Sequence, residues 1–176
     1  FSADGRKLSF QRSVNGGCDQ IYTLDLATGD TTRISNGTGR TTCSYFYPAG
    51  DRLLYASTHE ADPGCPARPD FSRGYVWPVY PTYDIFVADT LGTILTRLTD
   101  TPGYDAEATI SPKGDRIVFT STRDGDLELY TMNLDGSDVR RITNRVGYDG
   151  GAFFSPDGTK LVWRAQYPAT PEEEAD

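Results

Sequence analysis

The stretch that decides the fold is residues 111–143, SPKGDRIVFTSTRDGDLELYTMNLDGSDVRRIT. It opens with a Ser-Pro-Lys-Gly turn and runs into an apolar segment at 116–120, followed by apolar segments at 127–132 and 139–143. Each segment has strand length and is rich in β-branched and aromatic residues, and the Asp, Gly and Ser between segments let the backbone reverse. Together with the preceding segment at 106–110, the unit predicts four strands joined by hairpins in one antiparallel sheet.

The rest of the chain repeats this unit. Turns of the same kind start near residues 2, 47, 111 and 155, which gives spacings of 45, 64 and 44 residues. A propeller blade repeats every 40–45 residues or so, and the longer middle spacing reflects an insertion at 59–83. One small sheet cannot bury both of its faces, so we expect the copies to stack around an axis. The predicted fold is therefore all-β, a β-propeller of four-stranded antiparallel blades.

Counting strands predicts about three and a half blades over residues 1–167. The first copy keeps only the end of its innermost strand, and the last copy stops after its second strand. A closed propeller usually has four to eight blades, so we expect a partial or open propeller. Residues 168–176 are rich in proline and glutamate and are expected to form an acidic tail or linker.

Composition excludes several partners. The formal net charge of -8 argues against nucleic acid, because phosphate binding needs a basic face. A membrane span is not expected, since no run of eighteen or so apolar residues occurs. The cysteines lack the close spacing of a zinc site, so no metal is expected through them.

The repeated pattern resembles a known family. It reads Ser-Pro-Asp-Gly before Lys and an apolar run, then Asp-Gly before an apolar-Tyr pair, then Asp-Gly-Ser before Arg-(Ile/Leu)-Thr. This is similar to the WD40-like (PD40) repeat of the TolB-like propellers and covers nearly the whole chain outside the insertion and the tail. The first two copies are looser, since Ala3 replaces proline and the turn at Pro48 lacks aspartate. The resemblance implies a bacterial propeller that is periplasmic or secreted.

Loops of an up-and-down blade alternate between two faces. The insertion and the blade-to-blade links at 39–42, 103–106 and 147–150 should share one face, and the short repeat-opening turns should share the other. Irregular, loop-rich surfaces often carry function, so the first face is the expected binding surface. The residues expected to contact a partner there are Arg40, Tyr75, Trp77, Tyr80, Tyr104, Asp105, Tyr148 and Asp149. Aromatic residues suit recognition, but they could equally pack the insertion onto its own blade.

The link carboxylates have two interpretations. Asp105 and Asp149, with Glu107 close behind, could converge on Ca²⁺ or on a basic group of a ligand. The favoured alternative is structural, with each aspartate accepting backbone N–H bonds and each tyrosine packing between blades. No other cofactor is expected. Arg123 is expected to pair with a neighbouring blade.

The three cysteines predict one disulfide. Cys18 with Cys43 is the first choice, and Cys43 with Cys65 is almost as plausible, because either pair could bring its Cα atoms within roughly 7 Å. Three free thiols are the third alternative. A disulfide together with the family resemblance predicts an oxidising compartment.

Nothing in the chain predicts catalysis. His59 is the single histidine and no Gly-x-Ser-x-Gly motif occurs. The leading hypothesis is a non-catalytic module that binds a protein or peptide partner through the insertion-bearing face. One alternative is a self-assembling extracellular ring or filament, built through unpaired strand edges at the ends of the arc. The other is the substrate-gating propeller of a larger serine peptidase, to which the resemblance also extends.

Overall fold

The computed structural model describes residues 1–13, 16–72, 74 and 76–170, which form thirteen β-strands and no helix. None of these residues belongs to a helix that could cross a membrane. The strands form four antiparallel sheets, here numbered as blades. Blade 1 comprises β1 (Lys7–Ser13), β2 (Asp19–Asp25) and β3 (Thr31–Arg33). Blade 2 comprises β4 (Thr41–Phe46), β5 (Arg52–Ser57), β6 (Asp84–Asp89) and β7 (Ile94–Arg97). Blade 3 comprises β8 (Asp105–Ile110), β9 (Ile117–Ser121), β10 (Glu128–Met132) and β11 (Arg140–Arg141). Blade 4 comprises β12 (Tyr148–Phe154) and β13 (Leu161–Gln166).

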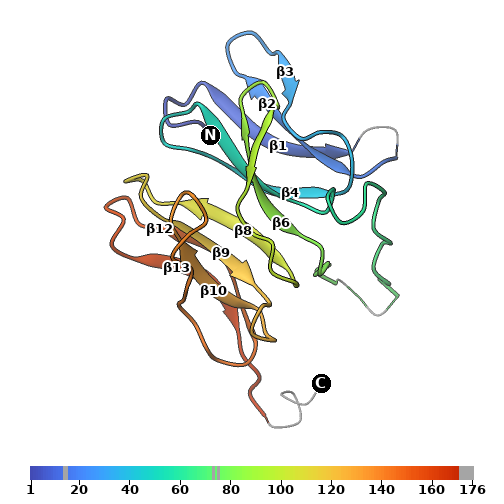
Figure 1. Ribbon diagram of the computed structural model, residues 1–176, viewed down its shortest axis with the longest axis vertical. Helices are drawn as coiled ribbons and strands as arrows, with labels where there is room; N and C mark the ends of the chain where they lie inside the picture. Colours follow the sequence, from blue (N-terminus) through green and yellow to red (C-terminus); the bar gives the residue numbers. More distant parts are fainter. Residues whose placement is uncertain (14–15, 73, 75, 171–176) are drawn as a thin grey trace.

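The blades follow one another as an open arc, with blade 1 at one end and blade 4 at the other (Figure 1). Within blades 2 and 3, the strands pair in sequence order. Innermost strands contact each other across blade boundaries, β4 with β8 and β8 with β12. The predicted all-β fold of four-stranded antiparallel blades in an open arrangement is confirmed.

The core lies between the blades. Consecutive strand residues point to opposite faces, so Leu53 of β5 belongs to a core cluster with Ile21 of blade 1, while Leu54 belongs to a cluster with Phe119 of blade 3. Both leucines are fully buried. This two-sided burial explains why β5 is a continuous apolar run instead of an alternating one.

Each innermost strand of blades 2 to 4 carries a bulge at the same place. The pairing register shifts after Thr42, Ala106 and Gly150. The next residues, Cys43, Glu107 and Gly151, have φ values of 53°, 55° and 60°. A residue in this left-handed conformation at a bulge bends the strand and redirects its side chain. The three positions line one cavity, described below.

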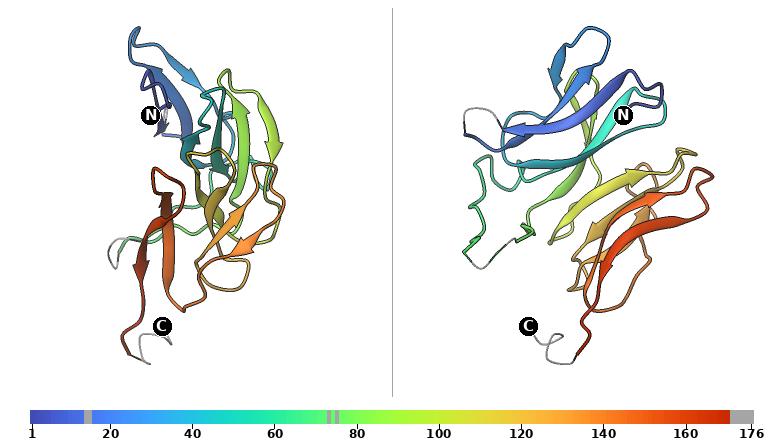
Figure 2. Two further views of the ribbon diagram at one scale, coloured as in Figure 1. Left: turned by 90° about the vertical axis from the view of Figure 1, so that its left-hand side faces the viewer. Right: turned by 180° about the vertical axis from the view of Figure 1, so that it is seen from behind.

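The two loop faces differ in regularity. Each repeat-opening turn is closed by a glycine N–H that donates to the carbonyl oxygen three residues earlier, at 2.8–2.9 Å in all four copies. In the right-hand view of Figure 2, these turns lie on one side of the molecule and the green insertion lies on the opposite side. We call the first side the turn face and the second the insertion face.

Candidate partner-binding site

Each blade-to-blade link holds one of its residues at a position that is equivalent in successive blades. Each link contains a glycine with positive φ packed against the end of the second strand of its own blade. A Cβ on Gly39 would lie 2.6 Å from the His59 nitrogen, and one on Gly103 would lie 2.8 Å from Thr122 Oγ1. The residues that follow these glycines, Arg40, Tyr104 and Tyr148, are therefore held in the same place in three successive blades.

The insertion is fixed at several points. Its Cys65 forms a disulfide with Cys18, directly before β2, with the Cα atoms 5.5 Å apart. The Gly39 N–H donates to the Pro63 carbonyl oxygen at 2.7 Å. Tyr83 packs edge-on against Tyr104, with ring centroids 5.8 Å apart. The insertion therefore bridges from blade 2 to blade 1 and is held at both ends.

Both predicted cysteine pairings are wrong. Cys43 is the free thiol, and the insertion carries Cys65 to blade 1 instead. The left-handed bulge in β4 turns Cys43 toward the inside of the arc, where it lines a cavity. Burial raises the pKa of the Cys43 thiol.

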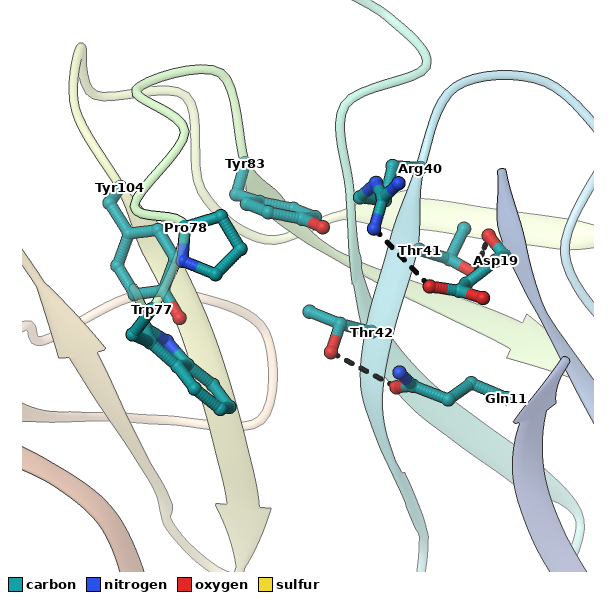
Figure 3. A pocket seen from close by; sticks show the side chains of 9 residues that line it. All are labelled: Gln11, Asp19, Arg40, Thr41, Thr42, Trp77, Pro78, Tyr83 and Tyr104. Atoms are coloured by element: carbon teal, nitrogen blue, oxygen red, sulfur yellow. Dashed lines mark hydrogen bonds and ion pairs between the residues drawn. The ribbon is translucent and has the colours of Figure 1, made fainter. Parts of the chain in front are cut away.

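A small cavity lies where blade 1, the first link and the insertion meet. This mouth pocket has a volume of about 130 Å³ and is lined by Gln11, Asp19, Arg40, Thr41, Thr42, Trp77, Pro78, Tyr83 and Tyr104 (Figure 3). In Figure 3 the aromatic and proline side chains lie on one side and the hydrogen-bonded polar side chains on the other. The pocket is therefore amphipathic.

Hydrogen bonds fix the polar wall. Arg40 Nη1 donates to Asp19 Oδ2 at 3.3 Å. The Thr41 hydroxyl donates to the Asp19 carbonyl oxygen at 3.0 Å, and the Thr42 hydroxyl donates to Gln11 Oε1 at 3.1 Å. These bonds tie β4 to β1 and β2, so the wall is built before any ligand arrives.

Trp77 joins the mouth pocket to a larger cavity of about 470 Å³ on the inner side of the arc, which it also lines. We call this second space the inner cavity. Cys43, Glu107 and Gly151 line it at the three bulges. The Arg164 guanidinium lies 5.6 Å from the Trp77 ring. Although it makes these contacts, Trp77 is 40% exposed.

The structure brings only some of the predicted partner residues together. Arg40, Trp77 and Tyr104 line the mouth pocket. Tyr80 adjoins it, since its ring lies 5.9 Å from that of Tyr83 and 6.0 Å from the Arg40 guanidinium. Tyr148 lies away from the mouth pocket and donates a hydrogen bond to Glu107 at 3.2 Å. Tyr75 lies outside the described residues.

The link aspartates are buried and already bonded. Asp105 is 1% exposed and accepts two hydrogen bonds from Arg123, at 3.0 and 3.1 Å. Arg123 therefore pairs within its own blade, and the expected pairing with a neighbouring blade is wrong. Asp149 is fully buried and accepts from the Trp163 indole N–H and the Tyr167 hydroxyl, both at 2.7 Å. The favoured structural interpretation is wrong about the donors, which are side chains instead of the expected backbone N–H groups.

The oxygens suggested for Ca²⁺ do not converge. Glu107 accepts from the Gly151 N–H at 2.9 Å and the Thr120 hydroxyl at 3.0 Å, so its carboxylate bonds blade 3 to blade 4. Across the part of the chain that the structure describes, no three His, Cys, Asp or Glu side chains form a group suited to a metal ion. These carboxylates act in the framework of the fold.

Sequence reasoning missed the other residues of the mouth pocket, notably Gln11, Asp19 and Thr42. Asp19 directly follows Cys18, so its place beside a disulfide-bonded insertion was a usable signal. Gln11 lies in the middle of β1 and carries no such signal. Its role depends on the contact between β1 and β4, which only the packed blades reveal.

Comparisons with known proteins agree with the fold. The model of the TolB beta propeller domain (PD40) family matches residues 80–171, just over half of the chain. The Tol-Pal system protein TolB of Bordetella pertussis (strain Tohama I) is 43% identical over 47 residues, 27% of this chain and 11% of that protein.

Solved structures extend the likeness to nearly the whole chain. A structure from Agrobacterium tumefaciens assigned to TolB has a TM-score of 0.76 at 24% identity and covers 97% of this chain and 54% of that chain. TolB from Acinetobacter baumannii has a TM-score of 0.71 at 22% identity, with 97% and 37% covered. At such identities the likeness shows the fold, and this chain spans only a part of either protein. On the family match, the chain belongs to the TolB β-propeller domain (PD40) family.

Proposed function

We propose that this chain is a non-catalytic binding module whose insertion face docks a protein or peptide partner. The observation that carries the proposal is Trp77, a large aromatic side chain that remains 40% exposed although disulfide and hydrogen bonds anchor the insertion around it. Interface hot spots are enriched in tryptophan, tyrosine and arginine, and preorganised side chains lose little entropy on binding. The mouth pocket gathers all three residue types around one small opening.

The single histidine supports a role without catalysis. His59 Nδ1 lies 2.8 Å from Ser57 Oγ, which resembles part of a nucleophile–base pair. Blade 3 repeats the same contact, with Arg123 Nε donating to Ser121 Oγ at 2.8 Å. Ser57 is 1% exposed and leaves a substrate no access. The contact therefore belongs to the framework at the end of β5, as its counterpart does at the end of β9.

The relatives and the disulfide suggest where the module works. The Bordetella relative is named as a Tol-Pal system protein, which suggests that this chain too serves in a protein assembly. The Cys18–Cys65 disulfide fits an oxidising compartment such as the periplasm or the outside of the cell. Because this chain spans only part of the length of these relatives, their partners are carried over as a proposal only.

A peptide selection tests the proposal. The folded chain, immobilised under oxidising conditions, is used to select binders from a random peptide library displayed on phage. Selected peptides should lose at least tenfold in affinity when Trp77→Ala is introduced, because a central aromatic anchor contributes roughly 2 kcal/mol or more. Leu91→Ala is the matched control, since Leu91 is 81% exposed on the turn face. Binders that respond to Leu91→Ala and ignore Trp77→Ala would overturn the proposal.

A further inference from the structure

We propose that the mouth pocket recognises a basic side chain of the partner, arginine above all, between its aromatic wall and the carboxylate of Asp19. The inference rests on the proposed function and names the chemistry of its central contact. The pocket volume of about 130 Å³ suits the head of one side chain and is too small for a folded element.

Within the described residues, the polar wall offers one carboxylate oxygen that accepts no hydrogen bond. Asp19 Oδ2 accepts a single hydrogen bond from Arg40, and Asp19 Oδ1 accepts none from the described residues. The carboxylate side chain is 28% exposed, against 20% for the Arg40 side chain, so an incoming group meets the anion more readily than the cation. A guanidinium presents a planar fork of donors that matches a carboxylate.

The aromatic wall favours a cation. Tyr83 and Tyr104 are buried, and burial raises the pKa of both phenols, so both rings stay neutral at physiological pH. Neutral aromatic rings attract cations over their faces, tryptophan most strongly. The protein already uses this chemistry here, since the Arg164 guanidinium lies 5.6 Å from the Trp77 ring. The aromatic wall of the mouth pocket therefore suits a guanidinium from the partner as well.

Charge supports the same occupant. The chain carries a formal net charge of -8, which draws basic partners toward its surface and slows acidic ones. Arg40 opposes this locally, but its charge is balanced by Asp19 at 3.3 Å. An acidic side chain pairing with Arg40 is the rival occupant, and it would have to displace Asp19 from that pair.

The test uses two blocked amino acids as probes. N-acetyl-arginine amide and N-acetyl-glutamate amide are titrated separately into the isotopically labelled protein, and the indole N–H signal of Trp77 is followed by NMR. The arginine probe should shift this signal and bind more tightly than the glutamate probe. Asp19→Asn should weaken arginine binding at least tenfold, whereas Arg40→Gln should strengthen it severalfold by freeing the carboxylate.

Controls separate recognition from misfolding. Asp19→Glu keeps the charge and should retain part of the affinity, and an unchanged spectrum away from the pocket shows that each variant is folded. The inference is overturned if the glutamate probe binds more tightly, if Asp19→Asn leaves arginine binding unchanged, or if neither probe moves the Trp77 signal. Phage peptides that require Trp77 but carry no basic residue would contradict this inference and leave the proposed function standing. A selection that yields no Trp77-dependent peptide would contradict the proposed function as well.

Discussion

The turn face and the insertion face are built on the same strands, but the repeated loops are alike on the turn face and differ from copy to copy on the insertion face. On the turn face, four turns share one backbone hydrogen bond and glycines with φ values of 67–73°. On the insertion face, each link keeps its glycine and then diverges, with arginine in one copy and tyrosine in two. The turn-face repeats therefore share one geometry, whereas each link on the insertion face presents different side chains. The difference agrees with the proposal that recognition lies on the insertion face.

The largest expected effect separates a buried ion pair from an exposed one. Arg123→Met should cost about 3–5 kcal/mol in the free energy of unfolding, because it strands a buried carboxylate. Arg123 pairs with Asp105, whose carboxylate is only 1% exposed. Arg140→Met on the turn face should cost less than about 1 kcal/mol, since its side chain is 69% exposed. Urea unfolding monitored by fluorescence measures both, and equal losses would contradict the contrast.

Removing the disulfide tests how far the insertion depends on its anchor. The double change Cys18→Ser with Cys65→Ser opens a link that spans 47 residues of chain. The loss should be about 2–4 kcal/mol, mainly from the larger entropy of the unfolded chain. Cys43→Ser is the control and should leave the disulfide intact. Unfolding curves with and without reductant should coincide for the double variant and differ for the wild type.

A glycine in each face offers a finer comparison. Gly39→Ala and Gly50→Ala both place a side chain at positive φ, with φ values of 60° and 73°. A Cβ at Gly39 would also collide with the backbone of His59, whereas one at Gly50 meets nothing within 4 Å. The Gly39 change should therefore cost about 1–3 kcal/mol more than the Gly50 change. A larger loss at Gly50, measured by thermal unfolding, would show that the turn face carries more strain than its geometry indicates.

The smallest expected effect concerns the loss of stability at low pH. Hydrogen bonds from the Ser155 and Thr159 side chains lower the pKa of Asp157 from 3.8 to about 2. A carboxyl group whose pKa is depressed by folding contributes stability above its unfolded pKa, and this contribution disappears as pH falls through the folded value. Asp157→Asn should therefore flatten the decline of the melting temperature as the pH falls from 3.8 to about 2, between the unfolded and folded pKa values. Parallel declines for variant and wild type would show that these bonds contribute nothing.

Local sequence predicted the features that depend on local chemistry. The turn spacing predicted the blades, and the alternation of loops between the two faces predicted that the insertion lies opposite the turns. The cysteine pairing failed because the insertion crosses from blade 2 to blade 1, and no residue in 59–83 encodes that path. The bonding partner of Asp105 was mispredicted because Arg123 reaches it across a hairpin. Whether a carboxylate meets solvent or a cation of its own blade depends on side-chain direction, which spacing does not specify.

The most direct test of the account locates the bound partner. Hydrogen–deuterium exchange is measured on the protein with and without a phage-selected peptide. The account predicts slower exchange at residues 39–42 and 76–83 on the insertion face, with the turns at 47–50, 111–114 and 155–158 unchanged. Protection of those turns, with free exchange on the insertion face, would contradict it.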